Sequence, residues 1–246
     1  MNEILKLLSA VLPGVLLLVF ILWTDRKNPE PFQLIIKAVL CGFISLGVLR
    51  LFWRYVPDYF TWAGVQDTII EKVRYAFLYA AFPEELAKLI MLWVVVSRNT
   101  YYNEPCDGIV YSVCIGLGFA TLENISYVSG HENWGGVALA RAMLSVPAHY
   151  LCAILMGYYY SIVRFWPSSG VKRLWKLVRI ILLPVLIHGT FDCMAIIISW
   201  HQIALYVFAF IFLIFVGWIH HYCNQLADKQ SLDAIGKLLH ELQKDG

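Results

Sequence analysis

The sequence predicts an all-α bundle of about seven membrane-spanning helices, and composition is the first observation that supports it. Hydrophobic residues make up 60% of the 246 residues and charged residues 15%. Soluble domains instead average about 45–50% apolar and about 25% charged residues. The apolar residues also form continuous runs of about 20 residues, the length that a helix needs to cross a bilayer. These runs lack the alternation of polar and apolar residues that is typical of a membrane β-barrel.

The composition also excludes other classes of protein. So apolar a chain is neither a disordered protein nor a secreted disulfide scaffold. The formal net charge of +2 gives no reason to expect a nucleic-acid partner. None of the six cysteines forms a CxxC pair and most lie in apolar runs, so we interpret them as small buried hydrophobic residues.

Seven apolar runs are candidate spans, and each is long enough to cross the bilayer as a helix. They are Ile4–Trp23, Phe32–Val56, Val73–Val96, Gly108–Val128, Val137–Phe165, Leu177–Trp200 and Ile203–Tyr222. No small-residue cleavage site follows the first run, so we interpret it as a retained span and not as a signal peptide.

The loops between these runs predict the orientation, because short loops rich in Lys and Arg tend to stay in the cytoplasm. The basic residues of the first, third and fifth loops are Arg26, Lys27, Arg98, Lys172, Arg173 and Lys176. The fourth and sixth loops, around 130–136 and His201, have no Lys or Arg. We therefore expect the N-terminus outside and the C-terminus inside.

The domain organisation is simple. Residues 1–228 are expected to form a single transmembrane catalytic domain, followed by a short cytoplasmic tail at 229–246. Apolar residues recur at helical spacing over Ser231–Gln243, which is typical of an amphipathic helix on the membrane surface.

Charged side chains in the third run carry the first functional signal. On insertion scales such a group costs at least ~2.5–3.5 kcal/mol near the centre of a span, so it is expected to face the bundle interior. Glu84 and Glu85 are adjacent, and Lys88 follows one turn later on the same side. Lys88 can neutralise one carboxylate, which leaves the other free to face a polar interior. Pro83 is expected to disturb the helix just before the pair.

The fourth run adds a third carboxylate, Glu123, between Phe119 and Asn124. Phe119 and Glu123 share a helix face because four positions separate them. Gly116 and Gly118 are expected to allow a neighbouring helix to approach closely.

Imidazoles come from the fifth and sixth runs. His149 follows a proline in the fifth, and His188 and Asp192 lie four positions apart on one face of the sixth. A carboxylate at that spacing can orient an imidazole or share a cation with it. The rise of 1.5 Å per residue places the acidic groups and His149 between the outer leaflet and mid-membrane. We therefore predict one hydrated cavity that opens outward.

Carboxylates and imidazoles in such a cavity suit three tasks. They can bind a divalent cation such as zinc, activate a water molecule directly, or relay protons in a transporter. The chain contains neither HExxH nor GxSxG, so it has no zincin-type helix and no support for a serine nucleophile.

The order of these motifs resembles the PrsW family of bacterial intramembrane proteases over roughly Asp25–Tyr222. The matching residues are EExxK (Glu84, Glu85, Lys88), FxxxEN (Phe119, Glu123, Asn124), His149 and HxxxD (His188, Asp192). PrsW proteins are distantly similar to the CAAX-prenyl protease and bacteriocin-processing superfamily. Lys88, Glu123 and Asp192 stand where that wider group has Arg, His and Asn, and these departures favour PrsW.

The resemblance implies a multi-pass endopeptidase of the bacterial cell membrane, surrounded by lipid and without a nucleic-acid partner. Its substrate would be a single-pass membrane protein such as an anti-sigma factor, cut first near the outer face during stress signalling. The family is grouped with metallopeptidases, while its superfamily relatives are also discussed as glutamate-dependent enzymes, so zinc and no cofactor both stay open.

The resemblance also suggests roles for the residues. Glu84 or Glu85 would activate a water molecule, and His149 and His188 would position it, bind a metal or stabilise the oxyanion. Lys88 would tune the Glu pair, and Glu123 and Asp192 would complete the site. Phe119 and Asn124 are further supporting residues. The candidate metal ligands are Glu85, Glu123, His149 and His188.

Two other functions use the same buried groups. A proton- or cation-coupled transporter predicts flux without peptide cleavage. A non-catalytic scaffold predicts that Glu85→Gln changes stability but no activity.

Overall fold

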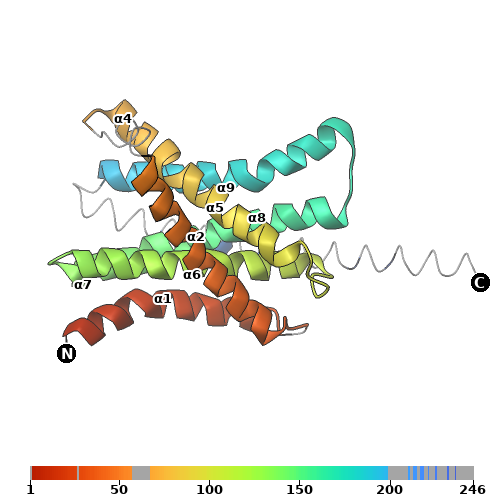
Figure 1. Ribbon diagram of the computed structural model, residues 1–246, viewed down its shortest axis with the longest axis horizontal. Helices are drawn as coiled ribbons and strands as arrows, with labels where there is room; N and C mark the ends of the chain where they lie inside the picture. Colours follow the sequence, from red (N-terminus) through yellow and green to blue (C-terminus); the bar gives the residue numbers. More distant parts are fainter. Residues whose placement is uncertain are drawn as a thin grey trace, which may run out of the picture.

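The described part of the chain is a helical bundle, as the composition predicts. The computed structural model describes residues 2–26, 28–56 and 67–198, together with isolated positions between 210 and 236. Across these residues the chain forms α-helices and two π-helical segments and no strand (Figure 1).

Six continuous helical runs make up the described part of the chain. Four are uninterrupted: α1 (Asn2–Thr24), α2 (Phe32–Tyr55), α6 (Pro105–Gly130) and α9 (Gly170–Ile198). A fifth run consists of α4 (Ile69–Arg74), η1 (Tyr75–Ala81) and α5 (Phe82–Val96). The sixth consists of α7 (Trp134–Ala140), η2 (Arg141–Ser145) and α8 (Val146–Phe165).

Five helical stretches are long and apolar enough to cross a membrane, which confirms a multi-pass helical membrane protein. They are Glu3–Thr24, Phe32–Tyr55, Pro105–Gly130, Trp134–Phe165 and Gly170–Ile197. The predicted span Val73–Val96 lies within the fifth run, where Glu84, Glu85 and Lys88 lower the apolar character. The orientation of the bundle stays a prediction.

Two predicted elements fall outside the described ranges, and one predicted loop is wrong. The seventh span, Ile203–Tyr222, and the tail helix, Ser231–Gln243, fall on residues that are not described apart from isolated positions. Lys172, Arg173 and Lys176 were expected in a loop, but α9 already begins at Gly170. Lys and Arg are good helix formers, and their long side chains can reach water from the first turns of a helix.

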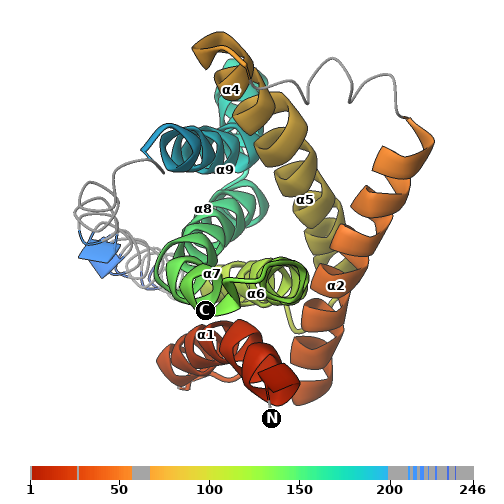
Figure 2. The same ribbon diagram turned by 90° about the vertical axis from the view of Figure 1, so that its left-hand side faces the viewer.

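Helix α6 lies at the centre of the bundle, with α1, α2, α5 and α8 packed around it (Figure 2). Glycines allow this packing. A Cβ atom at Gly42 of α2 would lie 2.2 Å from the backbone oxygen of Ile115, and one at Gly118 would lie 2.3 Å from that of Val39. A Cβ at Gly116 would lie 2.7 Å from a side-chain carbon of α8. The prediction that Gly116 and Gly118 allow close approach is therefore confirmed.

Each π-helical segment ends two residues before a proline. Segment η1 ends one residue before Phe82-Pro83, and η2 ends one residue before Val146-Pro147. A proline inside a helix lacks the amide donor and its ring clashes with the carbonyl four residues earlier. The wider π turn accommodates both effects without ending the helix. Pro83 thus disturbs the helix as predicted, by changing its type just before Glu84.

Candidate active site

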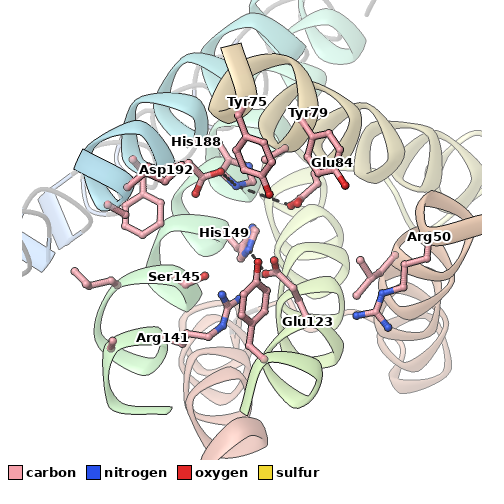
Figure 3. Close-up of a pocket in the computed structure, with 18 of the residues that line it drawn as sticks. Arg50, Tyr75, Tyr79, Glu84, Glu123, Arg141, Ser145, His149, His188 and Asp192 are labelled. Atoms are coloured by element: carbon pink, nitrogen blue, oxygen red, sulfur yellow. Dashed lines mark hydrogen bonds and ion pairs between the residues drawn. The ribbon is translucent and has the colours of Figure 1, made fainter. Parts of the chain in front are cut away.

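A polar cavity of about 750 Å³ opens among the helices. Every helical run except α1 contributes to its wall, and the polar side chains in it come from distant parts of the sequence (Figure 3). The labelled polar and aromatic lining residues are Arg50, Tyr75, Tyr79, Glu84, Glu123, Arg141, Ser145, His149, His188 and Asp192. Buried polar groups on different helices thus share one void, as the cost of exposing them to lipid requires.

Glu84 and Glu85 are neighbours in sequence but have different surroundings. Glu85 is fully buried, and its Oε1 accepts hydrogen bonds from Lys88 Nζ at 2.7 Å and from His188 at 2.8 Å. Glu84 lines the cavity, and its buried Oε2 has no hydrogen-bond partner among the described residues. Its nearest cationic atoms are Lys88 Nζ at 3.7 Å and His188 Nε2 at 3.9 Å. Glu84 therefore presents an unsatisfied acceptor to the cavity.

Both nitrogens of the buried His149 imidazole have partners. Nδ1 lies 3.0 Å from Lys88 Nζ, and Nε2 lies 2.9 Å from Oε2 of Glu123. The ring of Phe119 packs below them, with its centroid 5.5 Å from that of His149 and 4.1 Å from the Lys88 ammonium. Phe119 thus provides an apolar contact for His149 and a cation–π contact for the Lys88 ammonium.

His188 faces the cavity from α9. Its Nδ1 contacts Glu85, which leaves Nε2 directed toward Asp192 at 3.4 Å. The contact with Asp192 joins positions i and i+4, as the sequence spacing predicts. The His188 and His149 rings lie 4.9 Å apart and nearly perpendicular.

Arg141 is a cavity residue that the sequence analysis does not assign. Its Nη2 donates to Glu123 at 2.5 Å and its Nε donates to the Asn124 side-chain oxygen at 2.6 Å. Its guanidinium also lies over the ring of Tyr127. Asn124 in turn donates to the backbone oxygen of Ala10 in α1. An arginine in an apolar run is costly to expose to lipid, so its presence there could have indicated that Arg141 faces the bundle interior.

The cluster contains more carboxyl groups than permanent cations. Two permanent cations, Lys88 and Arg141, face four carboxylates in the described cluster. The carboxylates are Glu84, Glu85, Glu123 and Asp192. Like charges at this spacing in a low-dielectric interior are unfavourable, so the cluster favours binding of a further cation or a proton.

Three buried side chains have the geometry to hold a metal ion. Glu84, His149 and His188 each offer one ligand atom, and these atoms lie within 4.8 Å of one another. Two imidazoles and one carboxylate form a donor set that catalytic zinc sites use. The unsatisfied oxygen of Glu84 fits the same role. Among the described residues this group contains Glu84 where the predicted ligand set has Glu85, and it omits Glu123.

The chain is similar to known membrane proteases. Residues 30–218 match the family described as "PrsW family intramembrane metalloprotease". The protein named Protease PrsW from Geobacillus kaustophilus is 35% identical over 76% of this chain and 78% of its own length. Protease PrsW of Clostridioides difficile is 33% identical over 83% and 85%, and that of Bacillus subtilis 32% over 75% and 79%. No solved structure matches the chain significantly.

Proposed function

The chain belongs to the PrsW family of intramembrane metalloproteases, and we propose from this premise that it makes the first cut in an anti-sigma factor. The substrate would be a single-pass protein of the bacterial cell membrane, cut near the outer face. One observation carries the chemical part of the proposal. Glu84 presents an unsatisfied buried oxygen next to two imidazoles, inside a cavity enclosed by apolar helices.

Glu84 is the residue that we assign to water activation. Its carboxylate faces the cavity, so a water molecule there can donate a hydrogen bond to one of its oxygens and transfer a proton to it. Glu85 does not line the cavity, and its hydrogen-bond partners, Lys88 and His188, both belong to the proposed site. We therefore assign Glu85 to positioning His188 and Lys88.

The two imidazoles complete the proposed chemistry. His188 donates Nδ1–H to Glu85, which leaves the Nε2 lone pair directed into the cavity. His149 donates through Nε2 to Glu123 when Lys88 donates to its Nδ1. In this arrangement the Lys88 and Arg141 cations offset the carboxylates that border the reacting peptide.

We propose zinc as the cofactor, held by His149, His188 and one oxygen of Glu84, whose other oxygen would take the proton from water. Zinc supplies Lewis-acid polarisation of the peptide carbonyl and lowers the pKa of a water molecule at the site. Glu85, which accepts a hydrogen bond from Nδ1 of His188, would then orient that imidazole, as carboxylates commonly do around metal-bound histidines. Glu123 and Asp192 would complete the acidic surroundings of the site.

The position of the cavity supports a cut near the outer face. Glu123 lies in the last third of α6, next to the first half of α1, where Asn124 contacts Ala10. In the predicted orientation the N-terminus of α1 is outside. The proposed scissile bond would therefore lie closer to the outer surface than to the cytoplasm.

Co-expression with a candidate single-pass anti-sigma factor tests the proposal. The wild type should release the outer fragment, whereas Glu84→Gln and His149→Ala should leave the substrate intact. Glu132→Gln is the matched control, because Glu132 is exposed and lies outside the cavity. Full cleavage by both site variants, each shown to be folded, would refute the site assignment. Lack of cleavage of every candidate by the wild type would refute the substrate assignment.

Metal analysis tests the cofactor separately. The purified wild type should contain about one zinc per chain, and a chelator should stop cleavage until zinc is restored. His188→Ala should lower the zinc content, whereas Glu132→Gln should not. Unchanged cleavage after complete removal of metal would refute the zinc assignment while leaving Glu84 as the water-activating residue.

A further inference from the structure

Arg50 occupies one end of the cavity. It lies on α2 together with the lining residues Leu46 and Trp53, whereas the proposed catalytic groups lie at the centre (Figure 3). The opposite end is lined by α9, including Asp192 and Ile196. An extended peptide that lies along the cavity would therefore contact Arg50 on one side of its reacting bond.

Arg50 is exposed, but its side chain turns toward α6. Its Nη2 donates a hydrogen bond of 2.5 Å to the hydroxyl of Ser126 on α6, the helix that also carries Glu123. A lipid-facing arginine near the end of a span would instead extend toward the headgroups. The contact with α6 keeps the Arg50 charge in the cavity wall.

The charge of Arg50 has no acidic neighbour in the described part of the chain. Lys88 and Arg141 each contact a carboxylate within 4.0 Å, whereas no such ion pair involves Arg50. A neutral hydroxyl satisfies one of the five N–H donors of a guanidinium and leaves its charge uncompensated. Arginine matches a carboxylate better than any other side chain, because two parallel hydrogen bonds can form.

Aromatic side chains stiffen the wall beside Arg50. The Trp53 and Tyr79 rings stack with centroids 5.2 Å apart, and Tyr75 stacks on Tyr79 at 4.7 Å. All three rings line the cavity: Trp53 lies on α2 with Arg50, and Tyr75 and Tyr79 lie on η1. A stacked aromatic wall offers apolar contact to the stem of a bound side chain while Arg50 binds its end.

We propose that Arg50 forms a subsite for an acidic side chain of the substrate, Asp or Glu, near the bond that is cut. The proposal rests on the proposed protease function and adds the substrate chemistry of that site. It predicts that this enzyme prefers substrates with a carboxylate within a few residues of the cleaved bond, on the side that faces α2.

Binding measurements on an inactive enzyme test the subsite without requiring cleavage. The enzyme would carry Glu84→Gln and be placed in nanodiscs of phosphatidylcholine. The probes are fluorescent single-span peptides whose outer segment carries one Glu, or one Gln, at successive positions. We expect one position at which the Glu peptide binds about tenfold more tightly than its Gln counterpart.

Variants of α2 assign that preference to Arg50. Arg50→Gln should abolish the preference for Glu at that position, and Arg50→Glu should reverse it in favour of a Lys peptide. Arg54→Gln is the matched control, because Arg54 is exposed on the same helix as Arg50 is, but does not line the cavity. It should retain the full preference, and each variant should unfold at the temperature of the parent enzyme.

The outcomes separate the two proposals. Peptides that bind without any preference for Glu, or a preference that survives Arg50→Gln, would overturn the subsite and leave the protease function standing. A preference lost equally in Arg54→Gln would also overturn it. Failure of every peptide to bind would contradict the protease function itself. The Arg50→Gln variant could instead differ from the parent enzyme only in nanodiscs of phosphatidylglycerol, with no effect on the preference for a Glu peptide. That result would show that Arg50 binds lipid and would overturn the subsite.

Discussion

Oxygen Oε1 of Glu85 lies 2.8 Å from Nδ1 of His188, although 103 positions separate the two residues in sequence. The same oxygen lies 2.7 Å from Lys88 Nζ, so a fully buried carboxylate joins α5 to α9. Glu84, one residue earlier, has an unsatisfied oxygen in the cavity. Two adjacent glutamates therefore differ in role: one holds the site together and the other faces the reactants.

This difference predicts separate effects for Glu84→Gln and Glu85→Gln. Glu84→Gln should reduce cleavage by at least about 100-fold, because it removes the proton acceptor. Its thermal unfolding should stay close to that of the wild type. Glu85→Gln should also lower stability, by about 3–5 kcal/mol, because Lys88 loses its nearest buried counter-charge. Cleavage and thermal unfolding in detergent micelles measure both effects, and an equal loss of stability in the two variants would contradict the division of roles.

Arg141 should act on the reaction through Glu123 and Asn124. Arg141→Lys retains the charge but lacks the rigid planar fork that donates to Glu123 and Asn124 together, so we expect kcat to fall by about 10–100-fold with little change in KM. Arg141→Gln should lower kcat at least as much as Arg141→Lys does. Arg54→Lys, on the exposed face of α2, is the control and should behave as the wild type. An Arg141→Lys enzyme with normal kcat would show that the bidentate contact has no influence on the site.

Much of the site could be predicted from the sequence. Ionisable groups inside apolar runs must turn inward, and the spacing of His188 and Asp192 places both on one face. The cavity contains both, together with Glu84, Glu123 and His149. Their catalytic roles stay a prediction. The sequence could not tell which of the paired glutamates would face the void.

The reason lies in the helix geometry. Successive residues of an α-helix point about 100° apart, and the π turns of η1 and η2 change the direction of every residue that follows. A π turn leaves no pattern in the hydrophobic periodicity. The same shift explains why Arg141 could not be placed next to Glu123, since η2 begins at Arg141 itself.

Close packing between α2 and α6 predicts a strong effect of one methyl group. Gly42→Ala would place a Cβ atom 2.2 Å from the backbone oxygen of Ile115, so the two helices must separate. We expect a loss of about 1–3 kcal/mol in stability. Gly47→Ala on the same helix is the matched control, because no heavy atom lies within 4 Å of its added Cβ. Thermal unfolding should separate the variants, and equal melting temperatures would show that the interface can relax.

Asp25, in the connection between α1 and α2, should make stability depend on pH. Burial raises its pKa to about 7, and the nearby carboxylates Glu30 and Glu104 add to the increase. Between its ordinary value of 3.8 and about 7, the folded protein holds a proton that the unfolded chain releases. Stability from this group is therefore complete below that range and is lost as the pH rises through it. Asp25→Asn should raise the melting temperature at pH 8 and flatten its decline with pH, whereas Asp67→Asn at an exposed carboxylate should leave the profile unchanged. Parallel pH profiles for the wild type and Asp25→Asn would show that Asp25 is ionised in the folded protein throughout.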